Sequence, residues 1–110
     1  MVEELIREAI DRFNKKASED QALAQELAGV RKTVQVEVTD DGTYHFTLEN
    51  SRVGALAKGE TTSPDIRVIA STETLTQLRS GELRAMKAFA TRRLQIKGSF
   101  EDLLRLRKFF

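Results

Sequence analysis

Residues 33–48 read TVQVEVTDDGTYHFTL, and this stretch decides the fold. Apolar residues alternate with polar ones on both sides of a turn: Val34, Val36, Val38, Tyr44, Phe46 and Leu48. Such alternation is typical of strands that bury one face. The sequence DDG at 40–42 has the composition of a tight hairpin turn. The stretch therefore predicts two antiparallel strands with a common apolar face.

The segments outside this hairpin extend the pattern in both directions. Further strands are predicted at residues 53–58, 65–70 and 94–97. Helices are predicted at residues 3–16, 18–27, 71–78 and 83–90, and a last helix opens at Ser99 and runs to the end of the chain. Two segments have the form of a capping box, at 18–21 and at 99–102. The order of helices, meandering strands and helices predicts an α+β fold with helices over the one apolar face of the sheet.

Length and composition predict the general class of the protein. A chain of 110 residues is expected to form one domain spanning 1–110. It contains no cysteine, so disulfides, thiolate metal sites and cysteine nucleophiles are excluded. The first residues carry acids where a signal peptide needs an apolar core, and no run approaches the length of a membrane span. We therefore expect a cytoplasmic protein.

Charge is distributed unevenly along the chain. Residues 1–50 carry a net charge of −5 and residues 51–110 a net charge of +6. Nine of the twelve basic residues of the second half lie after residue 78: Arg79, Arg84, Lys87, Arg92, Arg93, Lys97, Arg105, Arg107 and Lys108. A basic face suits transient contact with an anionic membrane surface, although a solvated face explains the same clustering. Nucleic acid is not expected as a partner, because the chain lacks tryptophan and an aromatic-interleaved strand for base stacking.

No set of residues forms a catalytic or metal-binding constellation. His45 is the only histidine and lies on the polar side of its predicted strand. Asp40 and Asp41 are explained by turn chemistry, and Gly54 and Gly59 do not form a phosphate loop. We expect no catalysis, no metal and no cofactor.

Several short motifs occur together in a characteristic order. They are PDIRV at 64–68, GEL at 81–83, AF at 88–89 and LQIKG at 94–98. Their order and spacing resemble the sterol carrier protein 2 family over residues 5–106. Arg92 stands where that family often has glycine. The resemblance implies a five-stranded, mainly antiparallel sheet covered by helices, an apolar tunnel, non-covalent binding of a lipid and no catalysis.

The residues themselves point to an apolar chamber. The last helix carries an apolar arc of about 220°, wider than a one-sided helix needs, so it should contact something besides the core. The residues expected to line the tunnel are Phe46, Leu48, Leu75, Leu78, Met86, Phe89, Leu103, Leu104 and Phe109. Arg107 interrupts the apolar arc and is the candidate head-group contact, although an arginine that lies over apolar surface with its charge in water is the commoner reason for such a residue.

Two classes of function follow from these patterns. The first is binding, with or without transfer, of a fatty acid, fatty acyl group, phospholipid or sterol-like molecule. The second is an interaction or dimerisation module with a filled core and no bound lipid. The lipid's identity and the choice between monomer and homodimer stay open at the level of sequence.

Overall fold

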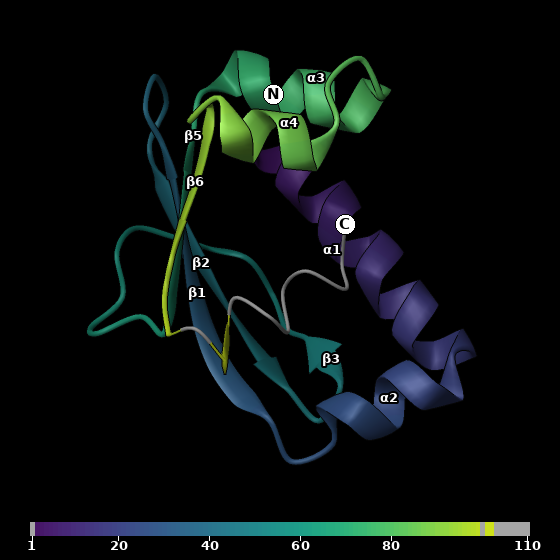
Figure 1. Cartoon of the computed structure of the whole chain (residues 1–110). Helices are drawn as coiled ribbons and strands as arrows, with labels where there is room; N and C mark the ends of the chain where they lie inside the picture. Colours follow the sequence, from purple (N-terminus) through teal and green to yellow (C-terminus); the bar gives the residue numbers. More distant parts are fainter. Residues whose placement is uncertain (1, 100, 103–110) are drawn as a thin grey trace.

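The computed structural model of the chain describes residues 2–99 and 101–102 (Figure 1). The helices are α1 (Val2–Glu19), α2 (Gln21–Leu27), α3 (Thr72–Ser80) and α4 (Ala85–Ala90). The longer strands are β1 (Arg31–Val38), β2 (Thr43–Glu49), β5 (Ile66–Ala70) and β6 (Leu94–Lys97). Two short strands are β3 (Arg52–Val53) and β4 (Ala57–Lys58). The predicted α+β class is confirmed.

One mixed sheet contains all of these strands. Its order is β3-β2-β1-β5-β6, and β4 also pairs with β2. β1 pairs with β2 antiparallel and with β5 parallel, and β6 pairs with β5 antiparallel. The sheet is therefore mainly antiparallel, as predicted, with a single parallel pairing at its centre among the described strands.

The predicted strand count was five, and the structure has six. The segment predicted as one strand at 53–58 is divided into β3 and β4, which pair with opposite ends of β2. Between them Leu56 packs against the core cluster of α1 and the sheet. Because Leu56 turns toward the core, the pairing with β2 is interrupted there, and the one predicted strand becomes two.

Tight turns connect the first three strands. At the β1–β2 turn, the Val38 N–H donates to the Gly42 carbonyl at 2.9 Å. At the β2–β3 turn, Asn50 and Ser51 both have positive φ, 54° and 62°. Two such residues in succession mark the hairpin turn whose twist suits antiparallel strands. The predicted meander is thus confirmed.

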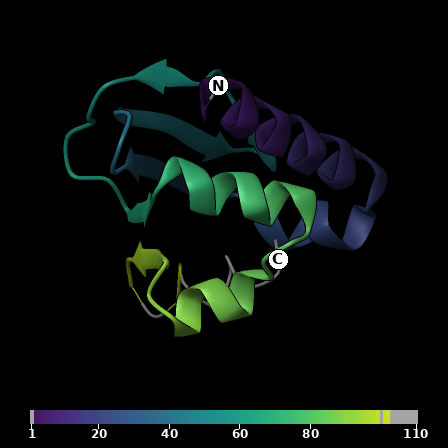
Figure 2. The same ribbon diagram turned by 90° about the horizontal axis from the view of Figure 1, so that it is seen from above.

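The core fills the space between the helices and one face of the sheet. On α1, Val2 and Ile6 are buried against strand residues: Val34, Val36, Val38, Tyr44 and Ile66. Seen from above, α1 and α3 lie next to one another over the sheet (Figure 2). Arg79 of α3 and Glu8 of α1 form an ion pair that joins the two helices. The helices therefore cover one face, as the alternating strands predicted.

The first helix boundary differs from the prediction. The second helix was expected to begin at Ser18 with a capping box to Gln21, but α1 continues through Glu19. Asp20 is the N-cap of α2, and its carboxylate accepts from the Leu23 N–H at 3.1 Å. The Ser18 hydroxyl instead donates to the Lys15 carbonyl within α1. The Asp20 N–H donates to the Lys16 carbonyl, so the hydrogen bonding of α1 continues past Ser18. Asp20 is therefore the residue that caps α2.

The later helices end as their sequences suggest. Ser71 caps α3 by accepting from the Thr74 N–H at 3.1 Å, and Gly81 follows α3 in the left-handed conformation, with φ of 83°. α4 is shorter than the predicted 83–90. Within the described residues, no helix combines the length and the apolar character that crossing a membrane requires.

Candidate functional site

The face of the sheet beneath the helices forms the floor of the candidate site. One cross-strand row runs from Tyr44 through Val36 and Val68 to Ile96. Tyr44 and Val36 are buried, whereas Val68 and Ile96 are partly exposed. This row is therefore shielded from solvent on β2 and β1 but only partly shielded on β5 and β6.

Val68 and Ile96 were not among the predicted lining residues. Both occupy the apolar, helix-facing positions of strands that the sequence did predict. The alternation in residues 65–70 and 94–97 was therefore a usable signal. The alternation does not predict which inward-facing residues the helices leave partly exposed.

The two predicted lining residues on β2 lie at the helix-facing side of the sheet. Phe46 is partly buried and packs against two apolar clusters, one under α1 and one near α2. Leu48 is buried in the second of these clusters, together with Leu27 and Val53. Leu48 is therefore part of the packed core, while Phe46 lies where the two clusters meet.

α3 supplies a wall above this floor. Leu75 packs against the cluster under α1 and against a third cluster formed by Ala70, Leu83, Ala88 and Leu94. Leu78 packs against the third cluster only, and both leucines are partly exposed. The structure thus brings Leu75 and Leu78 to the same side of the sheet as Val68 and Ile96, all in contact with the third cluster.

α4 turns Ala88 to the interior rather than Met86 and Phe89, the residues expected to line the tunnel. Ala88 is fully buried and Leu83 nearly so, whereas Met86 is 69% exposed and Phe89 is 50% exposed. The small Ala88 side chain lets the helix pack closely on its neighbours, which turns Met86 and Phe89 outward. Their assignment to a tunnel wall stays a prediction that these exposures do not support.

The remaining predicted residues, Leu103, Leu104, Phe109 and the head-group candidate Arg107, lie outside the described residues. Just before them in the chain, the Ser99 hydroxyl accepts from the Asp102 N–H at 3.1 Å, which confirms the Ser99 half of the predicted capping box. The Asp102 carboxylate is 5% exposed and lies 3.1 Å from the Lys32 ammonium of β1.

Two surface hollows lined by described residues lie away from this floor. One follows α1 and α2 near Lys16 and Leu23, and the other lies between α1 and β3 near Asn14 and Val53. Neither contains a residue predicted to line the tunnel. The tunnel itself therefore stays a prediction.

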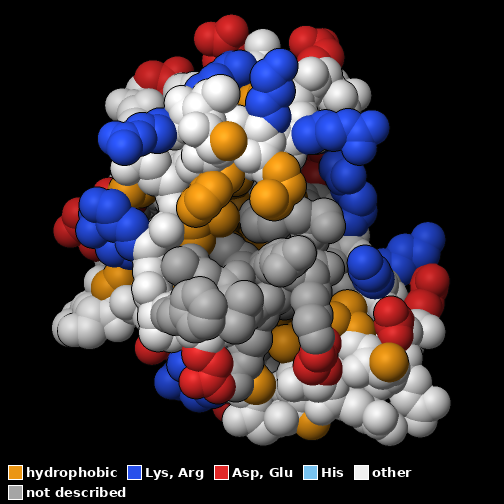
Figure 3. All heavy atoms as spheres, in the orientation of Figure 1, with side chains coloured by type: hydrophobic (Ala, Val, Ile, Leu, Met, Phe, Trp, Pro, Cys, Tyr) orange, Lys and Arg blue, Asp and Glu red, His pale blue; other side chains and the backbone are white. Residues whose placement is uncertain are grey.

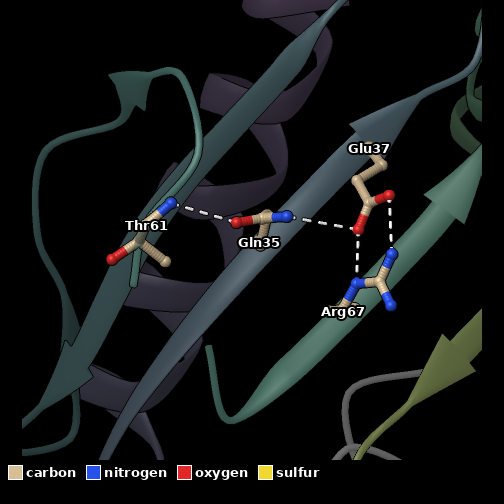
Figure 4. A network of polar contacts seen from close by, with 4 residues as sticks. All are labelled: Gln35, Glu37, Thr61 and Arg67. Carbon is tan, nitrogen blue, oxygen red and sulfur yellow. Dashed lines mark hydrogen bonds and ion pairs between the residues drawn. The ribbon is translucent and has the colours of Figure 1, made fainter. Parts of the chain in front are cut away.

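The other face of the sheet carries a polar network (Figure 4). The Glu37 carboxylate accepts two hydrogen bonds from Arg67, at 2.6 and 2.9 Å, and one from the Gln35 amide at 3.2 Å. Gln35 in turn accepts from the Thr61 N–H at 3.0 Å. The loop containing Thr61 thus lies over Gln35, which explains why this outward residue is only 6% exposed.

Hydrogen bonding shifts the ionisation of this network. The side-chain hydrogen bonds with Arg67 hold the pKa of the Glu37 carboxyl below its ordinary value of 4.5. The same hydrogen bonds raise the pKa of the Arg67 guanidinium above its ordinary value. Both groups therefore stay charged at neutral pH, which suits a structural pair better than an acid or base poised for proton transfer.

The residues that first suggested chemistry have structural partners. Nδ1 of His45 lies 2.9 Å from the Gly59 carbonyl oxygen. The Asp40 carboxylate accepts from the N–H and hydroxyl of Thr72 at the start of α3, and the backbone hydrogen bond lowers the pKa of Asp40. Among the described residues, no group of three or more His, Cys, Asp or Glu side chains could hold a metal ion.

Solved structures with related folds have low sequence identity to this chain. UbiJ-SCP2, a ubiquinone synthesis protein, is 17% identical, with coverage of 98% of this chain and 91% of its own and a TM-score of 0.68. Palmitated SCP2L2 from Aedes aegypti is 18% identical, with coverage of 91% and 88% and a TM-score of 0.62. The sec-alkylsulfatase Pisa1 from Pseudomonas sp. is 21% identical over 82% of this chain, with a TM-score of 0.61. The chain spans 13% of the length of that sulfatase.

These likenesses define the fold as that of a sterol-carrier-type domain. The chain belongs to the SCP-2 sterol transfer family, whose sequence model matches residues 10–110. The resemblance inferred from the short motifs is thereby confirmed, and the chain is a member of a family of lipid-binding domains. None of the curated proteins compared with the sequence matches it.

Proposed function

We propose that this chain binds one lipid non-covalently between the sheet and its helices and releases it unchanged. The observation that carries the proposal is the row from Tyr44 to Ile96, which is buried at one end and partly exposed at the other. The exposed end lies beside Leu75 and Leu78 of α3. An acyl chain would complete the cover that α1, α3 and α4 leave unfinished there.

The energetics favour a reversible carrier. Each methylene removed from water contributes about 0.8 kcal/mol, so a long acyl chain supplies about 10 kcal/mol of gross driving force. The ordering of the ligand and of the side chains around it offsets part of this gain. A net affinity well below the gross value allows the lipid to exchange.

The comparisons support a lipid as the ligand. The family is a sterol transfer family, and one structural neighbour is described as palmitated. The proposal covers fatty acids, fatty acyl groups, phospholipids and sterol-like molecules, with an anionic membrane as the source of the lipid. It includes no catalysis and no cofactor, and it places the protein in the cytoplasm, where a chain without cysteine needs no oxidising environment.

Val68→Phe tests whether the inner face has room for a ligand. In an open chamber the larger ring occupies ligand space, so the midpoint of thermal unfolding is kept while displacement of a fluorescent fatty acid weakens. In a filled core the same change costs about 1–3 kcal/mol through overpacking. Val36→Phe is the matched control, because Val36 is buried in the same row and should lose stability in either case.

Native mass spectrometry of the freshly purified protein tests the ligand directly. A co-purifying lipid, identified after extraction, supports the proposal. A lipid-free protein with no fatty-acid displacement, together with a destabilised Val68→Phe variant, overturns it. That result would favour the alternative of an interaction or dimerisation module with a filled core.

A further inference from the structure

The outward face of α4 carries two large apolar side chains. Met86 and Phe89 are 69% and 50% exposed, the two large hydrophobic residues that stand out in this way among those described. They are three positions apart on the helix, so they lie on one face. The fully buried Ala88 fixes the other side of α4 to the third apolar cluster. Figure 3 shows hydrophobic side chains gathered in this part of the surface, with Lys and Arg around them.

The charges around this face are almost all positive. Residues 79–97 contain six basic residues and one acid, Glu82. Three of the basic residues around α4 are exposed and form no ion pair with a described residue: Arg84, Lys87 and Arg92. Lys97 instead lies opposite Arg67 on the polar face of the sheet, where its charge acts on Glu37. By contrast, Arg79 is paired with Glu8, and Arg93 bonds Gln77. Met86 and Phe89, with cations around them that form no ion pair with a described residue, are complementary to a partner that carries anionic groups at its surface and an apolar phase beneath them.

The turn after α4 holds this face in a fixed orientation. Arg92 adopts the left-handed conformation, with φ of 64°, and its N–H donates to the Phe89 carbonyl. The Arg93 N–H donates to the Ala88 carbonyl at 2.9 Å. These two bonds form the Schellman motif that closes a helix. The chain then enters β6 directly, so Met86 and Phe89 are presented by a short helix fixed at its end.

We propose that α4 docks on an anionic membrane, with Met86 and Phe89 inserted among the acyl chains and Arg84, Lys87 and Arg92 on the lipid head groups. The inference rests on the proposed function, because docking brings the carrier to its lipid source. A membrane fits better than nucleic acid, since phosphates would satisfy the cations but offer Met86 no apolar phase. Anionic head groups strengthen such contacts roughly in proportion to the number of nearby cations.

Vesicle co-sedimentation tests the docking surface. Phosphatidylcholine vesicles with about 30% phosphatidylglycerol should bind the protein more tightly than pure phosphatidylcholine, and added salt should weaken this binding. Replacing both Met86 and Phe89 by Ser should lower the partition coefficient about tenfold or more. Replacing both by Leu should keep it, because leucine retains the apolar surface.

Two double substitutions test the contribution of the basic residues to vesicle binding. Arg84→Gln with Lys87→Gln should weaken vesicle binding about fivefold for each charge removed. Arg12→Gln with Lys15→Gln makes the same change in net charge on the exposed side of α1 and should leave binding near the original value. Equal losses from the two pairs would overturn the proposal, since net charge alone would then explain binding.

The remaining outcomes separate docking from lipid binding. Displacement of a fluorescent fatty acid without vesicles should be the same in the Arg84→Gln and Lys87→Gln variant and in the original protein, because neither side chain is assigned to the lipid site. If displacement fails in both while vesicle binding still depends on Met86 and Phe89, lipid binding is wrong and docking stands. Vesicle binding that is absent, or unchanged in the Ser variant, overturns docking. Binding of a short RNA that depends on Arg84 and Lys87, without vesicle binding, overturns it as well.

Discussion

Glu37 and Arg67 form a two-pronged ion pair between β1 and β5, the strands of the parallel pairing. Nε of Arg67 lies 2.6 Å from Oε2 of Glu37, and Nη2 lies 2.9 Å from Oε1. The pair lies on the sheet face opposite the apolar floor (Figure 4). It therefore fixes the spacing of β1 and β5 without entering the candidate lipid site.

This pair should make stability depend on pH. The pKa of Glu37 is lowered in the folded protein from 4.5, so the unfolded chain takes up the proton first as pH falls. The contribution is fully present above the unfolded value and is lost as pH falls toward the folded value. Between about pH 5 and about pH 3, the melting temperature of the original protein should fall about 2 °C further than that of Glu37→Gln.

A double-mutant cycle assigns this pH dependence to the pair. Arg67→Gln should flatten the pH profile in the same way as Glu37→Gln, and the double variant should resemble either single one. Calorimetry across the acidic range provides the measurement. Additive changes in the double variant would show that Glu37 and Arg67 act independently.

Arg92 occupies a backbone conformation that suits glycine. Its φ of 64° lies in the left-handed region, which costs a residue with a side chain about 1–2 kcal/mol. Glycine removes that cost but gives the unfolded chain more freedom. Arg92→Gly should therefore stabilise the fold by about 0.5–1 kcal/mol and raise the melting temperature by about 4 °C.

Gly81 provides the reverse experiment. It also lies in the left-handed region, with φ of 83°, and an added Cβ would meet no heavy atom within 4 Å. Gly81→Ala therefore tests backbone strain without a steric clash and should cost about 1 kcal/mol. A stabilised Gly81→Ala variant, or a destabilised Arg92→Gly variant, would contradict the assigned turn geometry.

The boundary between α1 and α2 gives a third prediction. The Asp20 carboxylate caps α2 through the Leu23 N–H, whereas the Ser18 hydroxyl bonds the Lys15 carbonyl on an exposed helix surface. Asp20→Ala should therefore lower stability by about 1 kcal/mol, as loss of an N-cap does. Ser18→Ala should have little effect in the same denaturant titration. The opposite ranking would restore the capping box that the sequence predicted.

Lys32 gives the fourth prediction. Its ammonium lies 3.1 Å from the Asp102 carboxylate, which is 5% exposed, so replacement by Gln removes a cation from a nearly buried anion. Lys32→Gln should lower the free energy of unfolding by about 1–2 kcal/mol. Arg31→Gln is the matched control, because its ion pair with Glu49 is largely exposed and should contribute little. Equal losses in urea titrations would rule out burial as the cause.

Local patterns were enough to predict most of the fold. The β1–β2 hairpin and the cap at Ser99 follow from neighbouring residues alone. The same information failed at residues 53–58. There Leu56 packs against a core cluster that includes residues of α1, which is distant in the sequence. The residues next to Leu56 therefore cannot predict that contact.

The candidate site was harder to predict for a related reason. Leu75 and Leu78 contact the third apolar cluster, whereas the exposures of Met86 and Phe89 do not support the prediction made for α4. There the small Ala88 is buried because the helix packs closely on its neighbours, and the large Phe89 is turned outward. Gln35 was expected at the polar face, and only the return of the loop at Thr61 buries it. Both outcomes depend on how distant elements meet.

The position of β1 between β2 and β5 has a consequence for the order of folding. Its antiparallel partner follows after a short turn, whereas its parallel partner starts at Ile66, opposite Val34, after the rest of the meander. Loops that close over long separations form slowly because their entropy is lost before contacts reward it. The hairpin should therefore assemble first, and docking of β5 against it should limit the refolding rate. Substitutions at Glu37 or Arg67 would then change refolding more than substitutions in the β1–β2 turn.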